Sequence, residues 1–90
     1  MTEIVWTDYL RYRAKLREFD MTAIEDIVRY GNERYFDTST GRWVVVGKHA
    51  STLVMIPYDI TEDGGITPVT IHATTRQQVN HRVKSARFRK

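Results

Sequence analysis

The sequence contains no cysteine, which excludes disulfide bonds and zinc or iron–sulfur sites held by thiolates. Its longest apolar run, Leu53 to Pro57, is far shorter than the roughly 20 residues that a membrane-spanning helix needs. The N-terminal residues Met1-Thr2-Glu3 lack the basic-then-apolar pattern of a signal peptide. These absences predict a cytoplasmic protein with no membrane partner.

Motifs for cofactor binding and covalent catalysis are also missing. No glycine-rich phosphate loop, paired-histidine metal motif or nucleophile elbow occurs. The histidines, His49, His72 and His81, are too scattered to predict a metal site. A chain of 90 residues builds one small core with little room for a deep cavity. We therefore expect a single domain over residues 1–90, with a shallow site and with neither cofactor nor metal.

Acidic residues are absent from the C-terminal part of the chain. After Asp63, residues 64–90 carry six Lys/Arg and no Asp/Glu. Residues 1–63 hold eight Lys/Arg against eleven Asp/Glu, a net charge of −3, so the overall +3 conceals a polarised chain. Such asymmetry favours the binding of an anion such as nucleic acid. The alternative is a basic C-terminus that only aids solubility.

Two helices are predicted in the N-terminal third. They follow a lead-in at residues 4–6, which is either a short strand or extended chain. In the first helix, apolar residues recur at three- and four-residue spacing and are expected to form the buried face: Tyr9, Tyr12, Leu16 and Phe19. The cations on the other face are either solvated or turned toward RNA: Arg11, Arg13, Lys15 and Arg17.

The second helix has clearer boundary signals. Residues 22–25 match a capping box, in which a threonine caps the helix and a glutamate three residues later bonds back to it. Ile24, Ile27 and Val28 form an apolar stripe that ends before Gly31. Because glycine enters the left-handed conformation easily, we expect Gly31 to terminate the helix in that conformation.

From Glu33 the apolar period changes to two, the spacing of a strand. Strands are predicted over residues 33–37, 42–47, 52–59 and 69–73, separated by turns of which 62–65 is the strongest. Pro57 predicts a bulge or an unpaired stretch near the end of the third strand. In hairpin order these strands form a four-stranded antiparallel meander with one face covered by helices. The fold class is therefore α+β, with two N-terminal helices packed on the meander.

Residues 74–90 are predicted to form a basic C-terminal helix or tail. Thr74 or Thr75 is its cap, with a glutamine three residues later. Its narrow apolar stripe is expected to dock one edge of the helix: Val79, Val83 and Ala86. The surrounding cations are candidate phosphate contacts: Arg82, Lys84, Arg87, Arg89 and Lys90. Arg42 and Lys48, in or beside a neighbouring strand, are expected to add positive field.

His72 and Arg76 are the strongest candidates for chemistry. His72 ends the last predicted strand, and Arg76 follows about one helical turn later. RNA cleavage without metal uses the 2′-hydroxyl as nucleophile and needs a base, an acid and a cation for the phosphorane. His72 fits the base or acid, Arg76 the cation, and Tyr58 a second proton donor if the strands place it alongside.

Each of these residues also has a structural interpretation. His72 is explained equally by a hydrogen-bonded structural histidine, and Tyr58 by the rim of the core. Arg76 is a candidate ion-pair partner of Asp59 or Glu62. The tryptophans, Trp6 and Trp43, are assigned to the core rather than to base stacking.

Several short motifs together resemble the BrnT-type toxins, small proteins of the wider RelE-like ribonuclease superfamily. The motifs occur in the same order over most of the chain: Ile4-Val5-Trp6-Thr7, a helix, Met21 to Val28, Arg42-Trp43-Val44-Val45-Val46-Gly47, Ile71-His72-Ala73 and Thr75-Arg76. The resemblance implies a compact domain of helices on an antiparallel sheet. It also implies metal-independent RNA cleavage that halts translation, and a cognate antitoxin that covers the active face.

The sequence departs from that family at three places. The closing strand of the family commonly ends in arginine, and here Thr74 follows Ala73 instead. The family's helix then begins Thr-x-x-Glu, where this chain has Gln78 in place of the glutamate. A His-Gly pair that often separates the first two helices is replaced by Phe19-Asp20. Arg76 is then the only candidate cation close to His72 in the sequence.

Three functions follow from these observations. The first is a toxin-like ribonuclease of a bacterial type II toxin–antitoxin pair. The second is a module that binds nucleic acid or protein without cleaving it. The third is a stand-alone domain that keeps the fold and uses its tail for solubility. Fold alone does not choose among the three, and the sequence predicts no oligomeric state.

Overall fold

A computed structural model describes residues 3–90, so Met1 and Thr2 of the N-terminal stretch interpreted above lie outside the described residues. The elements follow in the order α1 (Asp8–Leu16), α2 (Met21–Tyr30), β1 (Glu33–Asp37), β2 (Arg42–His49), β3 (Thr52–Ile60), β4 (Ile66–Pro68), β5 (His72–Ala73), α3 (Arg76–Lys84) and β6 (Phe88–Arg89). The predicted α+β class is confirmed. No helix within residues 3–90 is long and apolar enough to cross a membrane.

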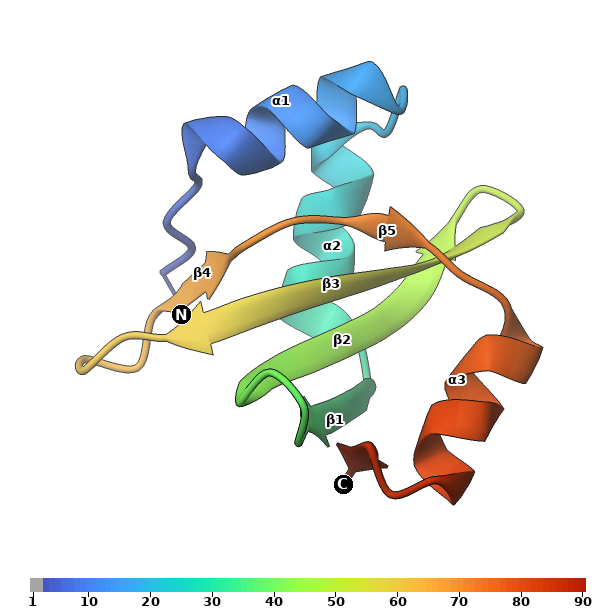
Figure 1. The fold of residues 1–90 in the computed structure, drawn as a ribbon. Coiled ribbons are helices and arrows are strands. Elements are labelled where there is room, and N and C mark those ends of the chain that lie inside the picture. Colours follow the sequence, from blue (N-terminus) through green and yellow to red (C-terminus); the bar gives the residue numbers. More distant parts are fainter. Residues whose placement is uncertain (1–2) are drawn as a thin grey trace.

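The sheet has six strands rather than the four of the predicted meander. Its order is β4-β3-β2-β1-β6, and β5 also pairs with β3. Of the strand predicted over residues 69–73 only β5 forms, and a further short strand, β4, lies just before that range. The lead-in forms a single parallel bridge, between Ile4 and Ile66. Figure 1 shows this N-terminal stretch beside β4.

Pro57 explains why β4 and β5 are two separate strands along β3. Pairing of β3 with β2 continues through Pro57, which lies opposite Val44. On the other side of β3, Tyr58 pairs with Pro68 and Met55 pairs with His72, so the facing chain holds one extra residue. Proline has no N–H to donate to a ladder. The predicted irregularity thus occurs in the chain that faces Pro57, and β3 itself is continuous.

Helices cover both faces of the sheet, whereas the sequence predicted cover on one. Side chains along a strand alternate between the faces. Val45 and Ile56 pack against Ile24 and Val28 of α2. The residues that alternate with them along the strands, such as Val44, point to the opposite face. There they form a second cluster with Val79 of α3 and Phe88 of β6. In Figure 1, α1 and α2 lie together on one side of the strands and α3 lies away from them.

The buried face of α1 is not the one predicted. Leu10 and Ala14 are 0% and 1% exposed, whereas Tyr9, Tyr12 and Leu16 are 53%, 62% and 63% exposed. Both sets have helical spacing, so the sequence carries two candidate stripes on one short helix. The small Ala14 belongs to the core cluster around α2. Its size lets α1 approach that cluster closely, and the larger side chains turn outward.

The second helix begins earlier and ends differently than predicted. Asp20 is the N-cap, and its Oδ1 accepts a hydrogen bond from the Thr22 backbone N–H at 3.1 Å. The predicted apolar stripe of α2 is buried. Gly31 has a φ of −61°, which is not left-handed. A Cβ at Gly31 would lie 2.6 Å from the Ile27 carbonyl oxygen and 2.8 Å from Val45 Cγ2, so close packing is what requires glycine here.

Residues 74–90 form more than the predicted helix or tail. Thr75 is the N-cap of α3, because its Oγ1 accepts a hydrogen bond from the Gln78 backbone N–H at 3.1 Å. Val79 is buried, but Val83 is 39% exposed and Ala86 is also exposed. Ala86 has a φ of 63° and lies in the turn that leads into β6. Phe88 there is 2% exposed, because it packs on the sheet beside Tyr35.

Candidate functional site

An open groove of about 210 Å³ lies on the side of the sheet that carries α3. Its floor includes Val44, Met55 and Pro57, which share one face of β2 and β3. His72 lines the groove from β5, directly opposite Met55 in the register. We call this hollow the α3-side groove.

The imidazole of His72 is partly buried and makes no hydrogen bond within residues 3–90. Burial lowers the pKa of His72, and the charges of Arg13, Arg17 and Arg82 lower it further. All of the charges that shift this pKa are therefore cations. At neutral pH the ring is mainly uncharged and has a nitrogen that can accept a proton.

Two elements supply these cations, and they come from opposite ends of the chain. Arg13 lies in α1 and Arg17 is its C-cap, whereas Arg82 lies in α3. Arg82 Nη1 lies 3.0 Å from Met55 Sδ, and its guanidinium is 5.5 Å from the ring centroid of Phe88. These contacts hold the Arg82 side chain over the sheet beside the groove. The α1 cations had no local sequence signal that linked them to His72, because more than fifty residues separate them.

Arg76 does not take part in this arrangement. Its Nη2 lies 2.9 Å from Glu33 Oε1, and its Nη1 bonds the second oxygen of the same carboxylate. This pair lowers the pKa of Glu33, chiefly through the hydrogen bonds from Arg76. Arg76 is absent from the charges that shift the pKa of His72. The ion-pair partner is thus Glu33 rather than Asp59 or Glu62, and the structure does not join Arg76 to His72.

Tyr58 lies on the opposite face of the sheet from His72. It belongs to the cluster beneath α1 and α2 and is 4% exposed. Its hydroxyl accepts a hydrogen bond from Arg34 Nη1 at 3.2 Å, and the Arg34 guanidinium lies 5.5 Å from its ring centroid. Met55 and Pro57 line the α3-side groove, and Tyr58 alternates with them along β3. The side-by-side placement of Tyr58 and His72 expected from the sequence is therefore not found.

The other predicted phosphate contacts fall into two groups. Arg42 and Arg87 line the groove, where they pair with Asp59 and Asp37, each at 3.1 Å. The remaining predicted cations are exposed and form no ion pair within residues 3–90: Lys48, Lys84, Arg89 and Lys90. Lys48 lies beside α2, next to Gly31 and Tyr30, away from the groove.

Asp37 and Arg87 form the least exposed ion pair of the groove. The side chain of Asp37 is 6% exposed and that of Arg87 is 40% exposed. Burial opposes ionisation of Asp37, but hydrogen bonds from Arg87 and from Ser39 outweigh it and hold the Asp37 pKa below its ordinary value. This pair ties the segment before β6 to the end of β1.

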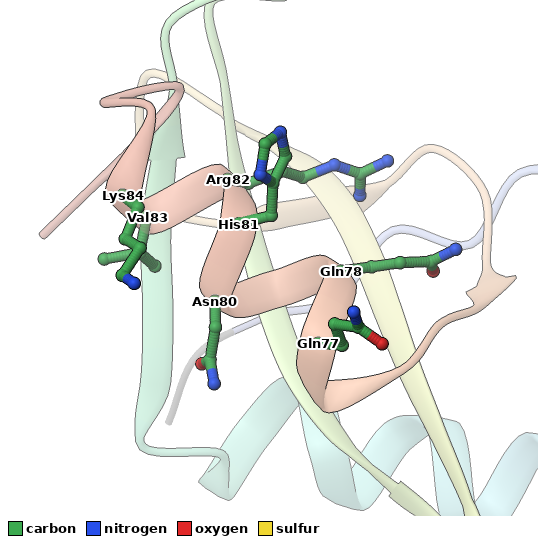
Figure 2. Close-up of a pocket in the computed structure, with 7 residues that line it drawn as sticks. All are labelled: Gln77, Gln78, Asn80, His81, Arg82, Val83 and Lys84. Carbon is green, nitrogen blue, oxygen red and sulfur yellow. The ribbon is translucent and has the colours of Figure 1, made fainter.

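A second, wider hollow lies on α3 itself and is shown in Figure 2. Its lining comes from one helix: Gln77, Gln78, Asn80, His81, Arg82, Val83 and Lys84. Figure 2 shows Gln78 and Arg82 extending to the same side of α3, while Asn80 and Lys84 point elsewhere. Because no second element provides an opposing wall, this surface suits an extended chain better than an enclosed small molecule.

The remaining histidines are distant from this chemistry. His49 Nε2 accepts a hydrogen bond from the Asp20 backbone N–H at 2.8 Å, and its ring meets Phe19 edge-on. His49 therefore fastens the β2–β3 hairpin to the start of α2. His81 is exposed on α3. Residues 3–90 contain no group of three or more His, Asp or Glu side chains placed to hold a metal ion.

Comparisons with protein-family models, with curated proteins and with solved structures find no significant match.

Proposed function

We propose that the protein is a toxin-like, metal-independent ribonuclease of a bacterial type II toxin–antitoxin pair, and that RNA binds in the α3-side groove. The observation that supports this is the unbonded His72 imidazole at the groove, with Arg13, Arg17 and Arg82 as the charges around it. A base with a lowered pKa among cations suits attack by a 2′-hydroxyl. The resemblance to BrnT-type toxins suggests the same function and a cognate antitoxin.

In this proposal His72 acts as the general base. Its uncharged ring nitrogen removes the proton of the RNA 2′-hydroxyl, and the 2′-oxygen forms a bond to the adjacent phosphorus. The bond from phosphorus to the 5′-oxygen breaks, and a water molecule in the groove protonates that oxygen. The hydroxide that remains takes the proton from the His72 imidazolium, which restores the water and the uncharged ring. The products are a 2′,3′-cyclic phosphate and a 5′-hydroxyl. Arg82, together with Arg13 and Arg17, stabilises the added negative charge of the phosphorane.

The first test is induced expression in a bacterial host, followed by growth and total-RNA integrity. The wild type is compared with His72→Ala and with His81→Ala, a matched control because His81 is an exposed histidine on α3. We expect the wild type and His81→Ala to arrest growth and fragment RNA, and His72→Ala to do neither. Fragments should carry cyclic phosphate ends. Equal cleavage by His72→Ala, or intact RNA with folded wild type, would overturn the proposal.

The second candidate is a nucleic-acid-binding module without catalysis. It is favoured by the placement of Tyr58 on the other face of the sheet and by the pairing of Arg76 with Glu33. Two of the three residues proposed for catalysis from the sequence are thus engaged elsewhere. This function predicts that purified wild type binds RNA and leaves it intact, and that His72→Ala binds equally well. Under it, Lys84→Ala and Arg89→Ala weaken binding by removing phosphate contacts.

A further inference from the structure

The outward face of α1 carries large side chains that the core does not use. Tyr9, Tyr12 and Leu16 are all more than half exposed. They recur at three- and four-residue spacing, so they lie in one row along the helix. We call this row the α1 tyrosine face. These three side chains lie outside both core clusters, so their exposed surface is available to a partner.

Cations lie on both flanks of the α1 tyrosine face. Helical geometry places Arg13 and Arg17 on the flank toward the core, and Arg11 and Lys15 on the far flank. The only carboxylate within the bounds of α1 is Asp8, in its first turn. The row of rings is therefore bordered by positive charge along most of its length.

Tyr9 is held in place by one of these cations. Arg13 Nη1 donates a hydrogen bond to the Tyr9 hydroxyl at 3.3 Å, and the Arg13 guanidinium lies 5.8 Å from the ring centroid. Arg13 also belongs to the charges that act on His72. The contacts of Arg13 with Tyr9 therefore place a cation directly against the α1 tyrosine face.

We propose that single-stranded RNA binds along the outward face of α1, with bases stacked on Tyr9 and Tyr12 and phosphates beside the flanking cations. This inference rests on the proposed RNA binding. Surfaces that bind single strands combine aromatic rings for stacking with cations that follow the backbone. Tyr9 and Tyr12 are separated by about 4.5 Å of helical rise, which suits neighbouring bases of one strand.

The chemistry of this face fits RNA better than an apolar protein surface. Only Leu16 is purely aliphatic, and each tyrosine presents a hydroxyl to water. Self-association through α1 would bring the cations of two copies together, which is unfavourable at an interface. A polyanion instead meets opposite charge on both flanks. Duplex RNA keeps its bases stacked internally, so it cannot use the tyrosine rings in this way.

The test is the affinity of a short single-stranded oligonucleotide with 2′-O-methyl groups, which binds without being cleaved. Fluorescence anisotropy compares wild type, a Tyr9→Ala/Tyr12→Ala variant and the corresponding double Phe variant. Tyr30→Ala is the matched control, because Tyr30 is 72% exposed on α2. We expect the double Ala variant to lose at least about fivefold affinity per ring. The double Phe variant and Tyr30→Ala should bind as wild type does.

Two further measurements keep the outcomes distinct. Circular dichroism confirms that each variant is folded, and a duplex of the same sequence should bind wild type and the double Ala variant equally. If wild type binds single strands and the double Ala variant binds them as tightly as Tyr30→Ala does, the inference fails while RNA binding stands. If wild type binds no RNA, the proposed function itself fails. A loss of dimer on sedimentation, with unchanged RNA affinity, would instead identify α1 as a self-interface and overturn the inference.

Discussion

The cations near His72 have two effects. They attract a phosphate, and they oppose protonation of the imidazole. Its pKa is lowered by burial first and by arginines from α1 and α3 second. A carboxylate partner would instead raise the pKa and leave less of the ring uncharged at mildly acidic pH. The arrangement therefore favours proton acceptance at neutral and mildly acidic pH.

We predict that the rate of RNA cleavage rises with pH to a midpoint below 6.5, the ordinary histidine value from which the His72 pKa is lowered. The reason is that only the uncharged ring accepts the 2′-hydroxyl proton. The measurement is kcat/KM against pH, together with an NMR titration of the His72 ring. His81→Ala should leave the profile unchanged. A midpoint above 6.5 would contradict the role given to this residue.

The same shift has a consequence for stability. As pH falls, the histidine of the unfolded chain takes up a proton near pH 6.5, before the folded one does. The free energy of unfolding should therefore decrease as pH falls through 6.5 and level off below the folded-state pKa of His72. Urea unfolding of wild type and His72→Gln between pH 7.5 and 5 measures this, because the variant lacks that contribution. A difference that does not change with pH would show that the His72 pKa is the same in both states.

Asp37 and Arg87 allow a second prediction for single side chains. Arg87→Ala leaves the buried Asp37 carboxylate without its charged partner and should lower the free energy of unfolding by about 1–3 kcal/mol at pH 7. Because the Asp37 pKa is lowered in the fold, this stabilisation is present above the ordinary carboxyl pKa. It is lost as pH falls through the folded value. Urea titrations at several pH values measure the effect.

The control for that experiment is Arg42→Ala. Arg42 pairs with Asp59 on the same face of the sheet, but these side chains are 42% and 53% exposed. Exposed pairs contribute about 0–1 kcal/mol, so the control should unfold almost as wild type does. Equal losses in the two variants would mean that burial of Asp37 does not set the strength of its pair.

At the scale of elements, α1 gives the sharpest test of the fold. Leu10→Ala removes a side chain that is 0% exposed and should cost about 2–5 kcal/mol of unfolding free energy. Leu16→Ala, at 63% exposure, should change it by less than about 0.5 kcal/mol. Chemical denaturation of the two variants measures the difference. A larger loss of unfolding free energy in Leu16→Ala than in Leu10→Ala would support the buried face predicted from the sequence.

The elements that the sequence predicted well are those with one strong periodic signal. Ile24, Ile27 and Val28 of α2 form a single stripe, and the valine-rich β2 reads as a strand from composition and period together. In α1 two stripes compete, and only contact with the rest of the core decides between them. Strand β6 has two residues, which is too short for any period to show, so its pairing with β1 could not be predicted.

The site was predictable only in part, because its contacts join distant segments. His72 was singled out from its position at a strand end, and the cap of α3 was limited to Thr74 or Thr75, of which Thr75 caps the helix. The Arg76 and Glu33 partners lie 43 residues apart, a separation over which sequence spacing carries no information. The sequence made a role for Tyr58 conditional on its lying beside His72, and that condition is not met because the register of β3 with β5 shifts by one residue relative to β4.

At the scale of the whole molecule, formal charge overstates the charge available to a ligand. Of the cations after residue 63, Arg76 and Arg87 already have carboxylate partners. Lys84 and Arg89 have none within residues 3–90. The anion-binding capacity of the basic C-terminal part is therefore smaller than its net charge of +6 suggests.

We predict that the salt dependence of RNA binding separates these two groups. Each phosphate contact to a single strand contributes about 0.7 to the slope of log K against log salt. Lys84→Ala and Arg89→Ala should each reduce the slope by about that amount, whereas Arg76→Ala should leave it almost unchanged. Anisotropy titrations at several salt concentrations between about 50 and 300 mM measure the slope for each variant. An equal reduction in Arg76→Ala would mean that RNA displaces Glu33 from the pair.

The pairing of β6 with β1 also affects the order in which the two cores can form. Asp37 and Arg87 are 50 positions apart, so a ribosome completes everything from β2 to α3 before β1 can meet its last neighbour. The core beneath α1 and α2 uses residues up to Ile71 and can close earlier. The core that contains Phe88 and Val79 cannot. Until β6 pairs with β1, the apolar floor of the future groove is uncovered, and we expect the partly folded protein to be most prone to aggregation in this interval.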